Sequence, residues 1–335
     1  MSQKKALITG ITGQDGSYLA EFLLKKGYKV CGIVRKTSHE DYTNIGHIQD
    51  DVDLFQGDLL DPVSLREIIQ KVNPDEVYNL ASQSHPAESF KQPIHTAEIT
   101  GIGAHRVLDA VLNLNPKAKF YQASSSEMFG WVKEIPQTEE TPFNPANPYA
   151  AAKLYAHAIT RIYRKSYNMF ASTGILFNHE SPRRHMGFVT QKVTYAVACA
   201  KLNIKTSSIL NEEGEPIYKN GKVSLGNLDA KRDWGFAGDF VEAMYMIMQA
   251  ETPDDFVVAT GETHTIKELC EEAFGCVNLN WKDYVVIDKR FIRPTETGPL
   301  VGDYSKAKKI LGWKPKTKFK ELVKIMVDAH LKRLK

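Results

Sequence analysis

The stretch Gly10-Ile11-Thr12-Gly13-Gln14-Asp15-Gly16 follows a short apolar run at 5–9 and precedes a pattern typical of a helix. In such a strand–turn–helix unit, the first glycine permits a tight turn, the second lets backbone approach a pyrophosphate, and the third allows close packing. Free N–H groups at the helix start would face the phosphates. Glycines also mark ordinary loops, so the motif has meaning only in this context. It predicts a dinucleotide-binding loop, with Thr12, Gln14 and Asp15 among the cofactor contacts.

Outward from this loop, strand-like and helix-like segments alternate through the first half of the chain. Strands are expected at 5–9, 29–34, 52–55, 76–80, 119–123 and 170–176, and helices at 15–27, 64–72, 101–114 and 148–167. This alternation is typical of a parallel sheet with right-handed crossovers. The predicted fold class is α/β: a Rossmann-type doubly wound parallel sheet with a smaller C-terminal α/β substrate-binding region.

The pattern loosens after residue 178. Further helices are expected at 188–202, 238–249, 266–274, 305–311 and 319–331. Asn220-Gly221 predicts a hairpin turn within a polar excursion at 206–223. We therefore expect a dinucleotide-binding domain over 1–178, joined by parts of 225–260, and a second region over 179–335 that interleaves with it.

Bulk composition limits the class of protein. The 335 residues are 42% hydrophobic, which suffices for a large core, and 43 basic against 40 acidic residues argue neither for nor against nucleic acid. No apolar run is long enough to span a membrane, and the N-terminus does not resemble a signal peptide. The four scattered cysteines indicate free thiols in a reducing compartment. We expect a cytoplasmic protein with no metal site and no nucleic-acid or membrane partner.

The end of the second predicted strand bears on the type of cofactor. An acidic residue there would suit an unphosphorylated ribose. The chain instead reads Val34-Arg35-Lys36-Thr37-Ser38. Two cations and two hydroxyls suit a 2′-phosphate, which favours NADP over NAD, although a solvated basic turn is the alternative. Asp58 and Leu59, after the third strand, stand where an adenine contact is expected.

Tyr149-Ala150-Ala151-Ala152-Lys153 places a phenol and an ammonium four residues apart, on one face of a helix. A lysine beside the phenol favours the phenolate, so that Tyr149 can act as a base. Just upstream, Ser124-Ser125-Ser126-Glu127 adds hydroxyls and a carboxylate. Read alone, Tyr149 and Lys153 could be a surface pair and Glu127 a polar loop residue.

Together these motifs resemble the extended short-chain dehydrogenase/reductase family, within it the nucleotide-sugar dehydratases, and most closely the GDP-mannose 4,6-dehydratase branch. The resemblance covers nearly the whole chain and is most specific in two long stretches, 178–184 and 226–235. The other stretches that carry it are the glycine motif, 79–85, 121–130, 148–153 and 293–296.

The resemblance implies a reaction. Tyr149, activated by Lys153, removes the proton from the sugar O4 while hydride leaves C4 for the nicotinamide; Ser125 orients the resulting ketone. Glu127 then takes the C5 proton, water leaves from C6, and hydride returns to C6, which yields GDP-4-keto-6-deoxymannose. Further cofactor contacts implied are Leu80, Ser82, Ser84, Tyr149, Lys153, His179 and Arg184. Substrate contacts implied are Ser84, Ser125, Glu127, Asn178, Val189, Lys192, Arg232, Arg293 and Glu296. A homodimer or homotetramer is also implied.

Some residues depart from the family pattern. Ser125 stands at the usual threonine, Gln191 and Asn44 at usual arginines, and the 206–223 excursion is longer than usual. These positions surround the sugar pocket and a subunit contact, so a dehydratase or epimerase of another nucleotide sugar (a GDP-heptose, or a dTDP- or CDP-hexose) is the alternative. A cofactor-binding regulatory or RNA-binding protein is a third possibility, but it predicts a broken catalytic set, whereas Glu127, Tyr149 and Lys153 are all present.

Overall fold

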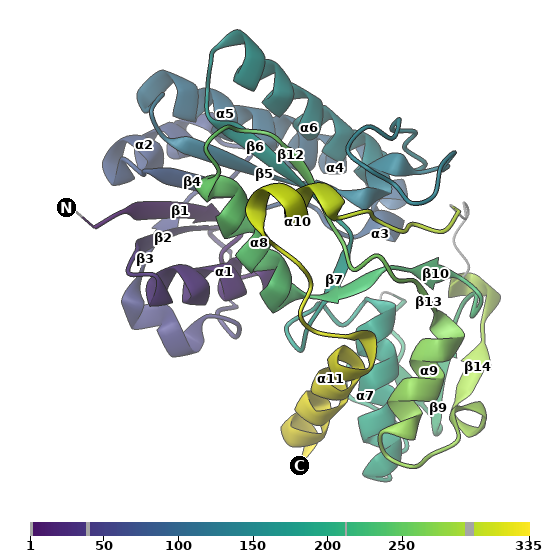
Figure 1. Ribbon diagram of the computed structural model, residues 1–335. Coiled ribbons are helices and arrows are strands. Elements are labelled where there is room, and N and C mark those ends of the chain that lie inside the picture. Colours follow the sequence, from purple (N-terminus) through teal and green to yellow (C-terminus); the bar gives the residue numbers. More distant parts are fainter. Residues whose placement is uncertain (1–2, 38–40, 212, 292–297) are drawn as a thin grey trace.

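The computed structural model describes residues 3–37, 41–211, 213–291 and 298–335. Its largest element is a sheet of seven parallel strands in the order β12-β6-β5-β4-β1-β2-β3 (Figure 1). The bounds are β1 Lys5–Thr9, β2 Lys29–Val34, β3 Val52–Gln56, β4 Glu76–Asn79, β5 Lys119–Ser125, β6 Ala171–Leu176 and β12 Asp255–Val258. This order, with β12 added beyond β6, is that of a Rossmann-type doubly wound sheet, so the predicted fold class is confirmed.

Helices cover both faces of this sheet, and each face has its own core. On β1, Ala6 and Ile8 point into a core shared with the first set of helices, whereas Leu7 points into the opposite core. Strands buried on both faces read as continuous apolar runs, which explains the composition of β1 and β2. The first set is α1 Gln14–Lys25, α8 Ala237–Gln249 and α10 Ser305–Leu311. The second set is α2 Pro62–Val72, α5 Gly103–Leu114 and α6 Pro148–Ser166.

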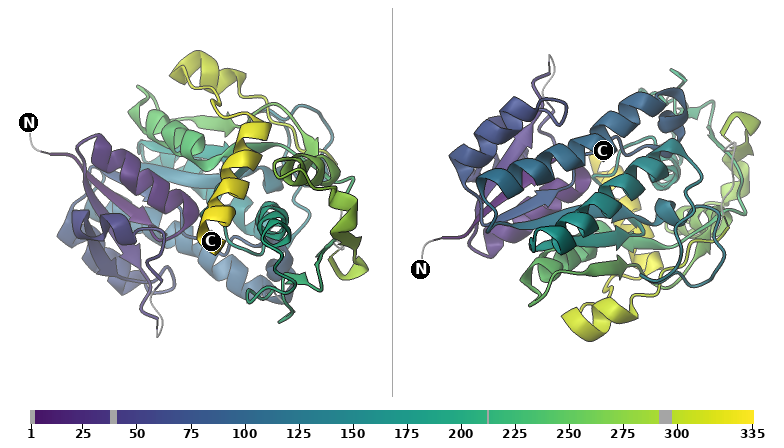
Figure 2. Two further views of the ribbon diagram at one scale, coloured as in Figure 1. Left: turned by 90° about the horizontal axis from the view of Figure 1, so that it is seen from below. Right: turned by 90° about the horizontal axis from the view of Figure 1, so that it is seen from above.

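A second region lies beside the carboxyl end of the sheet (Figures 1 and 2). Its helices α7, α9 and α11 pack with the small sheet β14-β9-β8 around a third core. Two short pairs, β7 with β11 and β10 with β13, lie between this core and the main sheet. The bounds are β7 Asn178–Glu180, β8 Tyr218–Lys219, β9 Lys222–Leu225, β10 Lys231–Arg232, β11 Trp234–Phe236, β13 His264–Thr265, β14 Val285–Ile287, α7 Val189–Lys201, α9 Ile266–Gly275 and α11 Phe319–Leu334.

Two local predictions can be compared with the structure. The hairpin at Asn220-Gly221 is confirmed: it joins β8 to β9, and both turn residues have positive φ, 52° and 76°, as this turn type requires. The helix expected at 101–114 begins earlier, because α3 Pro86–Lys91, α4 Pro93–Thr96 and a π-helical turn at Ala97–Ile102 precede α5. Short 3-10 turns occur at Gly46–Asp51, Ser126–Phe129, Trp281–Asp283 and Lys289–Phe291. Within the described ranges, no helix is both long and apolar enough to cross a bilayer.

Candidate active site

The glycine loop, residues 10–16, connects β1 to α1 and is closely packed. Gly10 has φ +73°, and a Cβ there would lie 3.0 Å from the Ala81 backbone. A Cβ on Gly16 would lie only 2.2 Å from the carbonyl oxygen of Gly10. Gly13 caps α1 without any side-chain hydrogen bond, so the N–H groups of the first turn remain available to an anion. These features fit the pyrophosphate of a dinucleotide.

An ion pair between the buried His179 and the half-buried Asp15 stands beside this loop. His179 Nε2 lies 2.9 Å from the Asp15 carboxylate, and the His179 ring stacks on Phe240. Burial alone would raise the pKa of Asp15, but the charge and hydrogen bond of His179, with a hydrogen bond from Gln14, hold it at about 2. Burial likewise opposes protonation of His179, but Asp15 outweighs it and raises the pKa of the imidazole. The pair therefore links the glycine loop to β7 of the second region.

The predicted site residues that the structure describes gather around one cavity of about 880 Å³, with Lys36 as the exception. Arg35 lines the cavity at the end of β2, whereas Lys36 is exposed outside it. Predicted residues on the lining include Gly10, Thr12, Gly13, Gln14, Asp15, Gly16, Asp58, Leu59, Leu80, Ser82 and Ser84, and also Asn178, His179, Arg184, Val189, Lys192 and Arg232. Arg293 and Glu296 lie outside the described residues.

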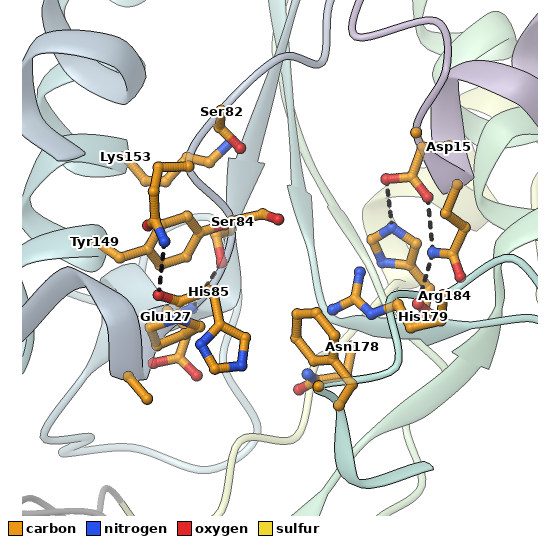
Figure 3. A pocket seen from close by; sticks show the side chains of 18 of the residues that line it. Asp15, Ser82, Ser84, His85, Glu127, Tyr149, Lys153, Asn178, His179 and Arg184 are labelled. Carbon is orange, nitrogen blue, oxygen red and sulfur yellow. Dashed lines mark hydrogen bonds and ion pairs between the residues drawn. The ribbon is translucent and has the colours of Figure 1, made fainter. Parts of the chain in front are cut away.

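The catalytic set, Ser125, Glu127, Tyr149 and Lys153, lies on one wall of this cavity; Figure 3 shows the last three there and Asp15, Asn178, His179 and Arg184 opposite. β5 ends at Ser125, and α6 begins just before Tyr149. The strand end and the helix start therefore bring together residues that lie more than twenty positions apart in the chain.

Burial governs the phenol and the ammonium. It raises the pKa of Tyr149 to about 12, although a hydrogen bond with Ser125 acts in the opposite direction. Lys153 donates to the Ala123 carbonyl oxygen at 2.9 Å, and its Nζ lies 5.8 Å from the centre of the Tyr149 ring. Burial lowers the pKa of Lys153 to about 8, which still leaves an ammonium at neutral pH. In the chain alone the phenol is therefore protonated, so the neighbouring lysine does not by itself make the phenolate that its spacing led us to expect.

Glu127 is held at its backbone by Ser125 and at its carboxylate by Asn147. The Ser125 hydroxyl accepts a hydrogen bond from the Glu127 backbone N–H at 3.2 Å. The Asn147 side-chain amide donates to Glu127 Oε2 at 3.0 Å. Glu127 is 7% exposed and lines the cavity, so its carboxylate is both sheltered and aimed at the space where a ligand would lie.

Sequence reasoning missed residues at the cavity mouth. Lys91 of α3 lies 3.9 Å from Glu213 of the polar excursion, and Arg290 lies 3.0 Å from Glu215. We call these two contacts the mouth pairs. Each joins segments far apart in the chain, and surface charges of this kind carry no local sequence signal.

Other residues of the site were missed as well. His85 and Phe188, whose rings meet edge to face at 5.2 Å, also line the cavity. Asn147 was missed too, although an asparagine directly before a helix-starting proline is a recognisable cap signal.

Comparison with known proteins decides the family. A family model described as GDP-mannose 4,6 dehydratase matches residues 7–326. The chain belongs to the GDP-mannose 4,6-dehydratase family. GDP-mannose 4,6 dehydratase 1 of Arabidopsis thaliana is 52% identical to it over 345 residues, which cover 99% of this chain and 91% of the relative.

Solved structures share the fold more widely than this family. The UDP-glucose 4-epimerase of Thermotoga maritima, solved with UDP-glucose, has a TM-score of 0.85 at 22% identity, covering 99% of this chain and 100% of its own. The dTDP-glucose 4,6-dehydratase of Bacillus anthracis, solved with NAD, has a TM-score of 0.81 at 22% identity, covering 98% and 97%. Because an epimerase and a dehydratase both have this fold, the fold does not separate the GDP-mannose 4,6-dehydratase family from its neighbours. The side chains in the cavity must do so.

Proposed function

We propose that this chain converts GDP-mannose to GDP-4-keto-6-deoxymannose and water, with NADP as its cofactor. The observation that carries the proposal is the position of Ser125. Its hydroxyl bonds both to Tyr149 and to the backbone of Glu127, so a base for a sugar hydroxyl and a base for the adjacent carbon belong to one connected unit. An oxidation followed by an elimination needs both bases.

The proposed steps use the wall of the cavity in order. A bound nicotinamide supplies a positively charged ring that takes a hydride from C4 and returns it to C6. Beside the Lys153 ammonium, Tyr149 would release its phenolic proton to solvent and, as the phenolate, accept the proton on the sugar O4. Ser125 donates to the new ketone, which acidifies the C5 hydrogen. Glu127 removes the C5 proton and can return a proton to the departing C6 hydroxyl, so that water leaves. When hydride reaches C6, C5 takes up the proton that Tyr149 accepted from O4, which completes the balance.

Three features support the proposed cofactor and its orientation. The closely packed glycine loop suits a pyrophosphate, and Arg35, which lines the cavity at the end of β2, suits a ribose 2′-phosphate. No acidic residue stands at the end of β2, where a ribose 2′-hydroxyl would need one. Comparing the affinities of NADPH and NADH for the wild type and for Arg35→Ala tests this, since the substitution should weaken NADPH binding alone. Equal losses for both cofactors would contradict a 2′-phosphate contact.

The reaction is tested with the full chain, GDP-mannose and NADP, followed by mass spectrometry of the nucleotide sugar. We expect loss of one water without net reduction of the cofactor. In Glu127→Gln, reduced cofactor should accumulate because oxidation proceeds and elimination does not. Product from a different nucleotide sugar, with none from GDP-mannose, would overturn the substrate assignment. Unchanged turnover in Glu127→Gln would overturn the mechanism.

We also propose a homodimer or homotetramer. Tyr155, Ile162 and Tyr167, on or next to α6, are 40%, 51% and 56% exposed, which leaves apolar surface on the outside of the monomer. Sedimentation at several concentrations tests the assembly, and a monomer at all of them would contradict it.

A further inference from the structure

Asn147 makes two hydrogen bonds with the two ends of one amide. Its Oδ1 accepts from the Ala150 backbone N–H at 2.8 Å and so caps α6, the helix that carries Tyr149 and Lys153. Its Nδ2 donates to Glu127 Oε2 at 3.0 Å. The backbone N–H can only donate, so the cap requires the amide oxygen on that side and leaves the NH₂ group toward the carboxylate. The orientation of this amide is therefore fixed by the fold.

We propose that Asn147 is a positioning residue for the base that removes the C5 proton, acting by holding one oxygen of Glu127 so that the other faces the sugar. This inference rests on the proposed function. The amide belongs to the cap of the helix that supplies Tyr149, and it bonds directly to Glu127. One side chain therefore sets the position of the O4 base relative to the C5 base.

The same contact also acts on the charge of the carboxylate. The amide donor lies against the negative charge of the Glu127 carboxylate, and the start of the 19-residue helix α6 adds the positive end of its dipole. Neither group carries a proton that it could lose at neutral pH. In the contact between Asn147 and Glu127, the carboxylate is therefore the group that can accept the C5 proton.

A purely structural role for Asn147 is the competing explanation, because any good cap would stabilise α6. Two substitutions separate the explanations. Asn147→Ser keeps a favoured capping residue but is too short to supply the amide donor, and Asn147→Asp keeps the cap and replaces the donor with a second carboxylate. Asp61→Ser is the matched control, since Asp61 caps α2, also precedes a proline, and is not among the residues that line the cavity.

The experiment measures product formation from GDP-mannose and from GDP-mannose deuterated at C5, together with reduced cofactor in a single turnover. For Asn147→Ser we expect kcat to fall about 10- to 100-fold, the effect of losing one hydrogen bond to a charged group. The isotope effect at C5 should rise while formation of reduced cofactor stays near the wild-type rate. For Asn147→Asp, the acidic limb of the pH–rate profile should move to higher pH, because adjacent like charges disfavour ionisation. Asp61→Ser should match the wild type.

Thermal unfolding of each variant shows whether the fold is retained. Wild-type kcat, C5 isotope effect and pH profile in the folded Asn147→Ser and Asn147→Asp proteins would overturn the inference and leave the proposed function intact. Absence of product from the wild type itself would instead overturn the proposed function. If Asn147→Ser does not fold, the pH profile of Asn147→Asp decides, because aspartate is an equally good cap.

Discussion

Two parts of the cavity differ in what holds them in place. At the floor, which we define as the glycine loop and the catalytic set, Gly10 and Gly16 leave no room for a Cβ, and the catalytic side chains are at most 8% exposed. At the mouth, Lys91 and Glu213 are 57% and 50% exposed and lie 3.9 Å apart. The floor is fixed by backbone packing, whereas the mouth is fixed by charges that water screens. Changes at the mouth can therefore alter which sugar nucleotide enters without disturbing the acid–base groups below, and the following substitutions test that difference.

The largest effect is expected from the floor. Tyr149→Phe removes the proposed O4 base while keeping the ring, and kcat should fall about 10²- to 10⁴-fold, the usual contribution of a positioned acid–base group. Steady-state product formation from GDP-mannose measures it. Tyr155→Phe on the same helix is the control and should leave kcat unchanged. Comparable activity in Tyr149→Phe and wild type would remove Tyr149 from the mechanism.

Packing of the glycine loop is tested next. In Gly16→Ala the added Cβ meets the Gly10 carbonyl, so the free energy of unfolding should drop by about 3 kcal/mol or more. Urea denaturation measures the loss. Gly275→Ala is the matched control, because a Cβ there meets nothing within 4 Å. Equal stability of the two variants would show that the backbone at Gly10 can shift away from Gly16 at little cost.

The Asp15–His179 pair should make the floor sensitive to acid. Asp15 has a pKa of about 2 in the folded chain against 3.8 in the unfolded chain, so its contribution of about 2 kcal/mol is complete above pH 4. It is lost as the pH falls from 4 to 2, when the carboxylate takes up a proton. Urea denaturation across this range should show a steeper loss in the wild type than in Asp15→Asn. Parallel curves would contradict the pairing.

The smallest effect is expected at the mouth. Glu213→Gln breaks an exposed ion pair, so KM for GDP-mannose should change less than about fivefold and kcat should not change. Raising the salt concentration should reduce even this difference. A loss of kcat would mean that the mouth takes part in positioning the reacting groups. That result would contradict the difference between a floor that carries the chemistry and a mouth that affects only binding.

The sequence predicted those parts of the site that follow from local pattern. The glycine spacing after an apolar run identified the loop, and the Tyr149–Lys153 spacing placed both groups on one helix face. The lysine's effect on the phenol was not predictable in the same way, because the burial that raises the pKa of Tyr149 comes from the whole fold. Spacing fixes direction on a helix, but it does not fix how much water remains around a side chain.

Contacts between distant segments were also beyond sequence reasoning. His179 lies 164 positions from Asp15, and Lys91 meets an excursion more than a hundred residues away. The helical turns before α5 were missed because Pro86 and Pro93 start helices there rather than only interrupting them. In each case the feature depends on contacts between segments that are distant in the sequence, which local sequence patterns do not encode.

The position of β12 has a consequence for synthesis on the ribosome. This strand, at Asp255–Val258, closes the sheet against β6, which ends at Leu176. At typical elongation rates, roughly 4 to 16 s pass between the emergence of the two strands. During that interval β6 has a free edge, which is the kind of strand that recruits other chains. Pairing of β12 with β6 late in synthesis therefore removes a strand edge that other chains could otherwise join.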